Sequence, residues 1–437
     1  MRFLTIAMSR TSAFGSVLII FLVAFFFPVR NRNGAASAQS SKGSPYLFVW
    51  AGGEDRKNSD FLAVIDARRE SNSYGQVITT VSVNESGTMP HHTEYEFPKN
   101  GILFANGWAG NRTFIFDLAN PTSPRIKRSF GSLGGYSFPH SFVRLPNGHV
   151  LATFQGRGSA YAPPGALLEL NEEGLVVRSS SAADPAVDSS LIWPYSLAVV
   201  PQADRVVMSS FVMGLPDWAS FPPGSWSKSQ IESGDTQHIQ IWSLSELKLL
   251  ATIPLPPSPD SKHEQNPAEP RILPDGSVYV STFNCGLYHL HDLARPKPTA
   301  HFVFAFPGGD LNTTPCGVPV VVGKFWVQTV AALPGLIALD ISNPEHPIEV
   351  SRLTLDSRFQ HPHWIAADRR ASRLVVTGSM QSWLLVVNLD ERSGSLSIDE
   401  GFREKSQKVP GLNFEHIQLP RGESVMIFPH GALFGPN

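Results

Sequence analysis

From residue 46 onward, apolar residues gather in short runs rich in β-branched and aromatic side chains, and clusters of Gly, Pro, Asn and Asp separate these runs. This pattern predicts β-strands joined by tight turns, and no convincing helical periodicity accompanies it. The first three predicted strands are residues 46–50, 61–66 and 76–81. Four more are predicted at residues 92–97, 101–106, 113–117 and 125–130.

A short Pro-centred motif returns along the chain and marks the start of each predicted unit. In this motif a bulky or polar residue precedes Pro, and a side chain able to bind a ligand follows it. The motif occurs at Met89-Pro90-His91, Phe138-Pro139-His140, Trp193-Pro194-Tyr195, Thr314-Pro315-Cys316, His361-Pro362-His363 and Phe428-Pro429-His430, with Ala268-Glu269-Pro270 as a shifted version. The seven starts are separated by roughly 45 to 75 residues, which indicates an internal repeat.

The strands at the two ends of the chain indicate how the repeat closes. Three predicted strands precede the first motif, and a lone strand at residues 425–433 accompanies the last one. Together they complete one four-stranded unit, and such units are typical of propeller blades. We therefore predict an all-β fold, a seven-bladed β-propeller closed by strands from both termini, in which closure removes exposed sheet edges. A pair of β-sandwiches is the alternative, but it does not explain why the end strands add up to one unit.

The composition agrees with a turn-rich β-protein. Charged residues make up 16% of the chain, which also contains 35 Gly and 36 Pro. The formal net charge is −2, and no stripe of Lys or Arg is present. We therefore expect no nucleic-acid partner.

The N-terminal residues 1–38 predict a signal peptide. Arg2 and Arg10 precede an apolar run at residues 13–29, and Ala36-Ser37-Ala38 has the small-x-small form of a cleavage site. An uncleaved membrane anchor is the alternative, because the run approaches the length that spans a bilayer. In both cases we expect residues 39–437 to form a single propeller domain outside the cytoplasm, either periplasmic or extracellular. Membrane contact would then be limited to the uncleaved segment.

The propeller geometry predicts that histidines far apart in sequence meet in space. The first strand of each blade lines the central channel, and the Pro-His motifs lie at the same end of these strands. The residues expected near one channel mouth are His91, His92, His140, His363 and His430. A cluster of neutral imidazoles suits Zn, Cu, Fe or Ni rather than Ca or Mg. A pocket in which the histidines donate hydrogen bonds is the alternative.

The chain contains two cysteines, Cys285 and Cys316. The first lies in a predicted turn between the second and third strands of a blade, and the other begins the next blade. An even pair in an oxidising compartment favours a disulfide. Two free thiols beside the histidines are the alternative.

Several stretches resemble the selenium-binding protein family, which includes bacterial methanethiol oxidases. The similar stretches are the pair His91-His92, the run at residues 195–210, the C-terminal Pro429-His430-Gly431, and the opening runs at residues 61–66 and 73–78. The resemblance implies a seven-bladed propeller in which His91, His92, His140 and His430 are metal-site residues. One departure is Gly75, where animal members carry Cys, so selenium attachment at this position is not available.

The resemblance also implies a function. Methanethiol oxidases of this family are copper-dependent and convert methanethiol, oxygen and water to formaldehyde, hydrogen sulfide and hydrogen peroxide. We therefore expect a copper-dependent oxidase acting on a small thiol or a related sulfur or selenium compound, with iron or zinc as other candidate metals. Glu94, Tyr95 and Trp108 are expected to orient the imidazoles. The alternatives are a non-catalytic propeller that binds a ligand or a protein, and a four-histidine iron oxygenase whose apolar tunnel residues 211–218 could line.

Overall fold

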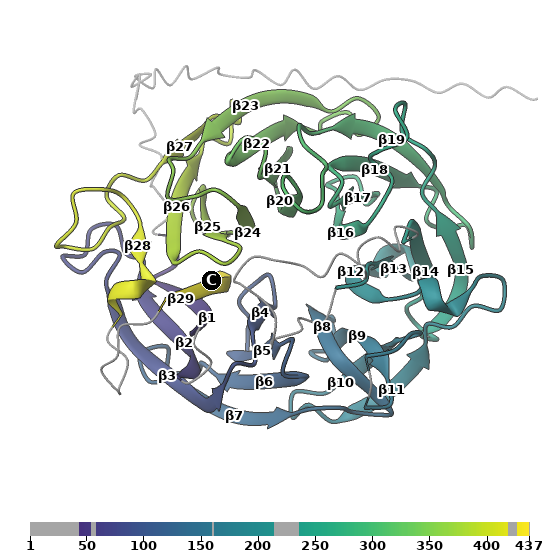
Figure 1. Cartoon of the computed structure of the whole chain (residues 1–437), viewed down its shortest axis with the longest axis horizontal. Helices are drawn as coiled ribbons and strands as arrows, with labels where there is room; N and C mark the ends of the chain where they lie inside the picture. The colour runs from purple at the N-terminus through teal and green to yellow at the C-terminus, as the bar shows by residue number, and fades with distance from the viewer. Residues whose placement is uncertain (1–42, 54–57, 160, 214–235, 418–425, 437) are drawn as a thin grey trace, which may run out of the picture. The chain divides into compact units, whose positions relative to one another are not determined.

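Seven antiparallel sheets surround a central axis in the computed structural model, which describes residues 43–53, 58–159, 161–213, 236–417 and 426–436 (Figure 1). The predicted seven-bladed propeller is therefore confirmed. The expected signal peptide and most of the run at residues 211–218 lie outside the described residues. Among the residues described, no helix is long and apolar enough to cross a bilayer.

The first three blades in chain order show how the sheets are built. The closing blade contains β29 (Ile427–Gly435), β1 (Tyr46–Gly53), β2 (Ser59–Asp66) and β3 (Val77–Ser86). The next contains β4 (Pro90–Thr93), β5 (Ile102–Gly107), β6 (Arg112–Asp117) and β7 (Arg125–Phe130). The third contains β8 (Tyr136–Arg144), β9 (Val150–Arg157), β10 (Ala166–Leu170) and β11 (Val176–Ser181).

The other four blades repeat this order. The fourth contains β12 (Pro194–Val200), β13 (Arg205–Ser210), β14 (His238–Ser243) and β15 (Lys248–Pro254), and the fifth contains β16 (Pro267–Ile272), β17 (Val278–Thr282), β18 (Gly286–His291) and β19 (Thr299–Ala305). The sixth contains β20 (Cys316–Val322), β21 (Phe325–Val330), β22 (Gly335–Asp340) and β23 (Ile348–Thr354). The seventh contains β24 (Pro362–Ala367), β25 (Arg373–Gly378), β26 (Trp383–Leu389) and β27 (Leu396–Ile398), with β28 (Leu412–Asn413) also paired to β26.

The helical segments are short 3₁₀ turns in the connections. They are η1 (Ser189–Leu191), η2 (Pro201–Ala203) and η3 (Phe414–His416). Burial decreases from the centre of the ring outwards. Every residue of β12 is buried, whereas β23 alternates between exposed and half-buried residues. The inner strands are buried on both faces because neighbouring blades cover them, and the outer strands have one face in water.

Strands from the two ends of the chain meet in the closing blade, as the strand count predicts. β29 pairs antiparallel with β1, so that Gly435 lies opposite Tyr46 and Ile427 lies opposite Gly53. The neighbouring seventh blade contributes a further link, since Trp364 Nε1 donates to the carbonyl oxygen of Ala432 at 2.7 Å. β29, the innermost strand of the closing blade, is therefore the last strand that the structure describes.

A buried ion pair in the seventh blade forms hydrogen bonds with the residues that flank β1 and β2. Arg373 Nε donates to Asp368 at 2.8 Å, and the side chains are 1% and 0% exposed. The same guanidinium donates to the carbonyl oxygens of Ala67 at 2.6 Å and Ser44 at 2.7 Å. Ser44 Oγ in turn donates to Asp368 at 2.6 Å. A charge pair at such depth is stable because these hydrogen bonds replace its lost hydration.

Candidate metal centre

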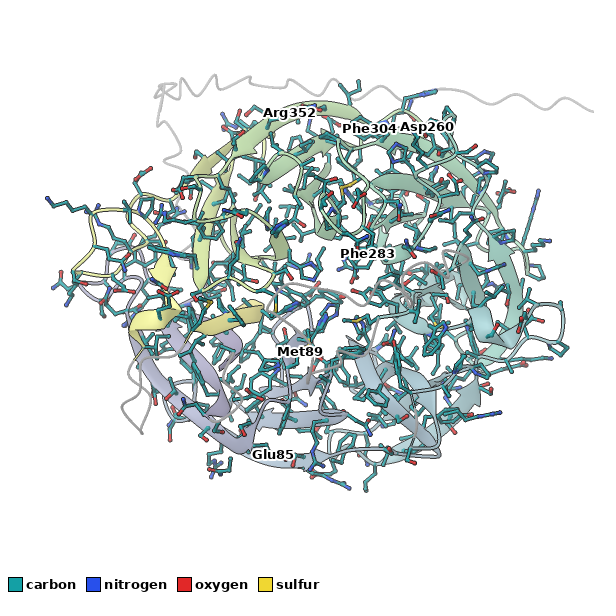
Figure 2. The ribbon with its side chains drawn as sticks, in the orientation of Figure 1. Glu85, Met89, Asp260, Phe283, Phe304 and Arg352 are labelled. Carbon is teal, nitrogen blue, oxygen red and sulfur yellow. A yellow bond between two sulfur atoms is a disulfide. The ribbon has the colours of Figure 1, made fainter. Side chains whose placement is uncertain are left out.

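Every innermost strand carries a β-bulge at the position of the Pro-centred motif. In each of the seven blades the ladder register shifts by one extra residue on the innermost strand, as between Pro90 and Thr93 or between Pro139 and Phe142. A bulge re-aims a side chain and also accommodates Pro, which cannot donate to the ladder. The repeated motif therefore turns one side chain per blade towards the centre of the ring. Figure 2 shows Met89, which precedes the first Pro-His, and Phe283 near this centre, whereas Glu85 and Arg352 lie at the rim.

All five predicted histidines lie together at this level. The ring centroids are 4.4 Å apart for His91 and His92, 4.3 Å for His92 and His140, 4.2 Å for His91 and His430, and 4.8 Å for His363 and His430. Two sets of three offer ligand atoms within 4.8 Å of one another: His91, His92 and His140 form one set, and His91, His363 and His430 form the other. His91 therefore belongs to both sets.

Burial keeps the five imidazoles neutral at ordinary pH. It lowers the pKa of His140 from 6.5 to about 3 and that of His363 to about 4. Burial also lowers the pKa of His91, His92 and His430 well below 6.5, and repulsion between neighbouring imidazoles lowers it further. The neutral ring is the form that binds a metal ion.

Some ring nitrogens of the five histidines have hydrogen-bond partners and others do not. Four of these five rings have a buried nitrogen without a hydrogen-bond partner in the described part of the chain: His91 Nδ1, His92 Nε2, His140 Nε2 and His430 Nδ1. The opposite nitrogen of His140 lies 2.8 Å from the carbonyl oxygen of Tyr195, and that of His92 lies 3.1 Å from Ser141 Oγ. Buried polar atoms are normally satisfied, and leaving one unpaired costs about 1–3 kcal/mol. Unpaired nitrogens on four clustered rings fit a bound transition metal, and the donor set is nitrogen-only.

Of the three residues expected to orient the imidazoles, Tyr95 and Trp108 lie beside them. The Tyr95 ring is 6.2 Å from that of His92, and the Trp108 ring is 6.5 Å from that of His91. Trp108 Nε1 donates to Gln155 Oε1 at 2.9 Å, so it supports the wall around the site rather than an imidazole nitrogen.

Glu94 differs from the expectation. Its buried carboxylate accepts from Arg144 Nη2 at 2.5 Å and from the backbone N–H of Phe104 at 3.1 Å. The predicted strand at residues 92–97 ends at Thr93, so the chain leaves the ladder and turns the Glu94 side chain towards β5 and β8. Glu94 is thus bonded to an arginine of the neighbouring blade and not to a histidine.

The two cysteines form the expected disulfide. Cys285 and Cys316 are bonded, with their Cα atoms 5.0 Å apart. Both are buried in an apolar cluster that also contains Leu287, Trp326 and Val330. No free thiol is left in the chain, so the alternative of two reactive thiols beside the histidines does not describe this structure.

In sequence, the chain is similar to known methanethiol oxidases. No family model matches the chain. The chain is 27% identical to a methanethiol oxidase of Hyphomicrobium sp. over 328 residues, which cover 70% of this chain and 69% of that protein. It is also 30% identical to a methanethiol oxidase of Ruegeria pomeroyi over 141 residues, which cover 31% of this chain and 32% of the relative.

In fold, the chain is similar to several proteins of solved structure. A periplasmic gluconolactonase of Pseudomonas aeruginosa shares the fold with a TM-score of 0.57 at 13% identity, over 81% of this chain and 94% of that one. A hypothetical selenium-binding protein from Sulfolobus tokodaii aligns with a TM-score of 0.69 at 18% identity, over 89% of this chain and 93% of its own. The chain is therefore similar in sequence to methanethiol oxidases and in fold to a selenium-binding protein. The resemblance found in the sequence is thereby confirmed.

The structure adds residues that the sequence did not single out as part of the site. Tyr195 and Phe283 occupy neighbouring positions: the Tyr195 ring lies 3.9 Å from that of His140, and the Phe283 ring is parallel to that of His363 at 6.4 Å. Trp364 follows His363 and lies 5.0 Å from the His92 ring. The signal for Tyr195 was its place in the repeated motif, whereas Phe283 lies in the turn before Cys285 and carried no such signal.

Apolar side chains cover the side of the imidazole cluster towards β12 and β16. Trp108, Tyr195, Phe211, Met213, Ala268 and Phe283 form one buried cluster. Met89 and Leu311, which are half-buried, pack against it. The imidazoles therefore lie between a wall of aromatic and methionine side chains and the rest of the ring, in a setting that excludes water from one side.

Proposed function

We propose that this protein is an exported, copper-dependent oxidase of small thiols, with the metal held by His91, His92, His140 and His430 and with His363 as a further candidate ligand. The observation that carries the proposal is the cluster of five imidazoles, four of which have a buried ring nitrogen without a hydrogen-bond partner in the described part of the chain. The methanethiol oxidases among the relatives support the reaction class, and the imidazole donors support copper. Iron and zinc remain the competing metals.

Copper, when bound, supplies one-electron redox chemistry and an affinity for thiolate sulfur. The residues of the chain perform the remaining tasks. The neutral imidazoles offer lone pairs without first losing a proton, because their pKa values are lowered. The apolar wall of Phe211, Met213 and Phe283 favours a small uncharged thiol such as methanethiol over a charged one, since a charged group would lose hydration there.

The proposed reaction balances without a further reductant. Methanethiol, dioxygen and water give formaldehyde, hydrogen sulfide and hydrogen peroxide. The carbon atom loses two electrons as the C–S bond breaks and a C=O bond forms with oxygen from water. Dioxygen accepts these two electrons and becomes hydrogen peroxide. The proposed reaction therefore needs a metal centre and access for methanethiol, dioxygen and water, but no organic cofactor.

The test is to purify the protein from cells supplied with copper, to measure bound metals by elemental analysis, and to assay methanethiol consumption together with the three products. We expect about one equivalent or more of copper and formation of all three products. Bound iron with no thiol turnover would favour the oxygenase alternative. Protein without any bound transition metal would favour the binding platform and contradict the proposal.

Export is tested separately. We expect the protein in the periplasmic or extracellular fraction, with a mature N-terminus close after Ala38. An intact N-terminus in a membrane fraction would indicate the uncleaved anchor instead. Recovery of intact protein from the cytoplasm would contradict export.

A further inference from the structure

The five imidazoles of the candidate metal centre form a row along four consecutive innermost strands. His363 lies on β24, His430 on β29, His91 and His92 on β4, and His140 on β8. Ring centroids of neighbours in this order are 4.8, 4.2, 4.4 and 4.3 Å apart. Rings two places apart are separated by 6.2, 5.8 and 4.9 Å. The imidazoles are therefore spread along an arc and are not gathered around one point.

A single metal ion is too small to be bound by the whole row. Zinc lies about 2.0–2.1 Å from an imidazole nitrogen, so two nitrogens on one ion of this size are about 4.2 Å apart at most. Among the described residues, the groups of ligand atoms that lie within 4.8 Å of one another contain three histidines each, and none contains four or five. Each group of three can surround one ion after small side-chain movements. Two ions are needed to use all five imidazoles.

His91 is the member that the two groups share, and it occupies the middle of the row. A neutral imidazole has one nitrogen with a lone pair and one N–H, so it ligates a single ion. Loss of the N–H proton to solvent gives the second nitrogen a lone pair as well, and metal binding drives such proton release. His91 Nδ1 is buried without a hydrogen-bond partner in the described residues, so no described donor competes for it. The His91 ring can therefore bridge two ions.

Both groups also contain an unpaired nitrogen outside His91. In the first group, His92 Nε2 and His140 Nε2 are buried without a partner in the described part of the chain. His140 Nδ1 lies 2.8 Å from the carbonyl oxygen of Tyr195, which only accepts, so His140 carries its proton on Nδ1 and keeps the lone pair on Nε2. In the second group, His430 Nδ1 is likewise buried and unpaired. Each group therefore has a nitrogen of its own with which to bind an ion.

We propose that the cluster is a two-ion centre bridged by the His91 ring. One ion binds at His91, His92 and His140, and the other binds at His91, His363 and His430. The deprotonated bridge carries one negative charge, which offsets part of the charge of two buried cations. The inference deepens the proposed function by dividing its candidate ligands between two ions, and it rests on that function only for the identity of the metal. Reduction of dioxygen to hydrogen peroxide takes two electrons, and two one-electron ions match this number.

The first test counts the ions. Metal-free protein is titrated with Cu(II) and, separately, with Zn(II), in the presence of a chelator that outcompetes weak surface histidines. We expect two equivalents of either metal in the wild type, and one equivalent in His140→Gln and in His363→Gln, since each change removes a ligand from only one group. One equivalent in the wild type would overturn the proposal, and this measurement does not depend on whether a variant folds.

His289→Gln is the matched control for the titration. Both ring nitrogens of His289 already contact protein groups, so this variant should keep two equivalents. Two equivalents in both His140→Gln and His363→Gln would show that the ions bind elsewhere and would overturn the proposal.

The second test examines the bridge by EPR of the Cu(II)-loaded protein at liquid-helium temperature. Two Cu(II) ions joined by one imidazolate couple magnetically, so the integrated signal of the wild type should fall well below its copper content. His363→Gln, with one ion left, should give a signal equal to its copper content. A wild-type signal that accounts for both copper ions would overturn the bridging role of His91.

Metal count and methanethiol turnover together separate the two-ion centre from the proposed function. Two equivalents of copper without methanethiol turnover would support the two-ion centre and contradict the proposed function. One equivalent of copper with methanethiol turnover would support the proposed function and overturn the two-ion centre.

Discussion

His91 and His430 are separated by 339 positions in the sequence, and their ring centroids lie 4.2 Å apart. The first residue belongs to β4 and the second to β29, the strand that closes the ring. This contact exists only because the closing blade takes its innermost strand from the end of the chain. It ties the candidate metal centre to the completeness of the fold.

Replacement of His140 by Ala should sharply reduce bound metal, because this change removes one of the four unpaired nitrogens. His289→Ala is the matched control. His289 is also buried, but its two nitrogens contact Glu345 at 2.8 Å and Ser277 at 2.8 Å, on β18 away from the innermost strands. Elemental analysis of both purified variants checks the prediction. Equal metal loss in both would refute the placement of the site.

The stability of the metal-free protein should fall as the pH is lowered below about 6.5. Burial holds the pKa of His363 at about 4 and that of His140 at about 3 in the folded state, against 6.5 without burial. Between these values the unfolded chain binds more protons, so its free energy drops relative to the folded state as pH falls. Each such group contributes a slope of up to about 1.4 kcal/mol per pH unit.

Urea denaturation at pH 7.5 and pH 5.5 measures this slope, and His363→Gln should reduce it. An equally steep pH dependence in His363→Gln would show that this ring titrates normally in the folded protein. The same pKa values predict that copper affinity persists down to about pH 5, below the pH at which exposed histidines lose a metal.

Arg373→Met should destabilise the protein by about 3–5 kcal/mol, because it leaves the buried Asp368 carboxylate without its cation. It also removes the guanidinium bonds to Ser44 and Ala67 that hold the N-terminal strand. Arg125→Met is the control. Arg125 pairs with Asp117, but its side chain is 75% exposed, so its loss should cost less than about 1 kcal/mol. Urea midpoints of the two variants compare them directly, and similar midpoints would contradict a role for Arg373 in closure.

Removal of the disulfide by Cys285→Ala together with Cys316→Ala should lower the free energy of unfolding by about 3–4 kcal/mol, as expected for a loop of 31 residues. Copper content should stay at the wild-type level, since neither sulfur offers an unpaired ligand atom. Thiol titration of the denatured, unreduced wild type should detect no free thiol. Detection of two would show that the bond does not form in the cell.

Much of the fold was predictable because its signals are local and repeated. The Pro-His motifs and the turn clusters recur along the chain, and the strands left over at residues 46–81 and 425–433 indicated closure. The five histidines followed from the same count, since equivalent positions in successive blades face one centre. The disulfide was predictable because Cys285 and Cys316 fall on adjacent predicted blades.

Side-chain direction beyond the bulges was not predictable from spacing. Glu94 and Tyr95 are adjacent in sequence, and both were expected to orient an imidazole. In the structure, Glu94 accepts a hydrogen bond from Arg144, and Tyr95 donates one to Glu269. The two side chains diverge because β4 ends at Thr93 and the chain then turns. Tyr95 finds its position by stacking on Trp364, a residue of the seventh blade, and no local pattern encodes that contact.

Because His430 lies in β29, a growing or truncated polypeptide that ends before residue 427 lacks both the final strand and one imidazole of the cluster. During synthesis the other four histidines emerge earlier, but His430 joins His91 and His363 only when β29 closes the ring. The group of His91, His363 and His430 is therefore complete only after the ring has closed. Under the proposed function, a metal ion held by this group would bind only to a closed ring.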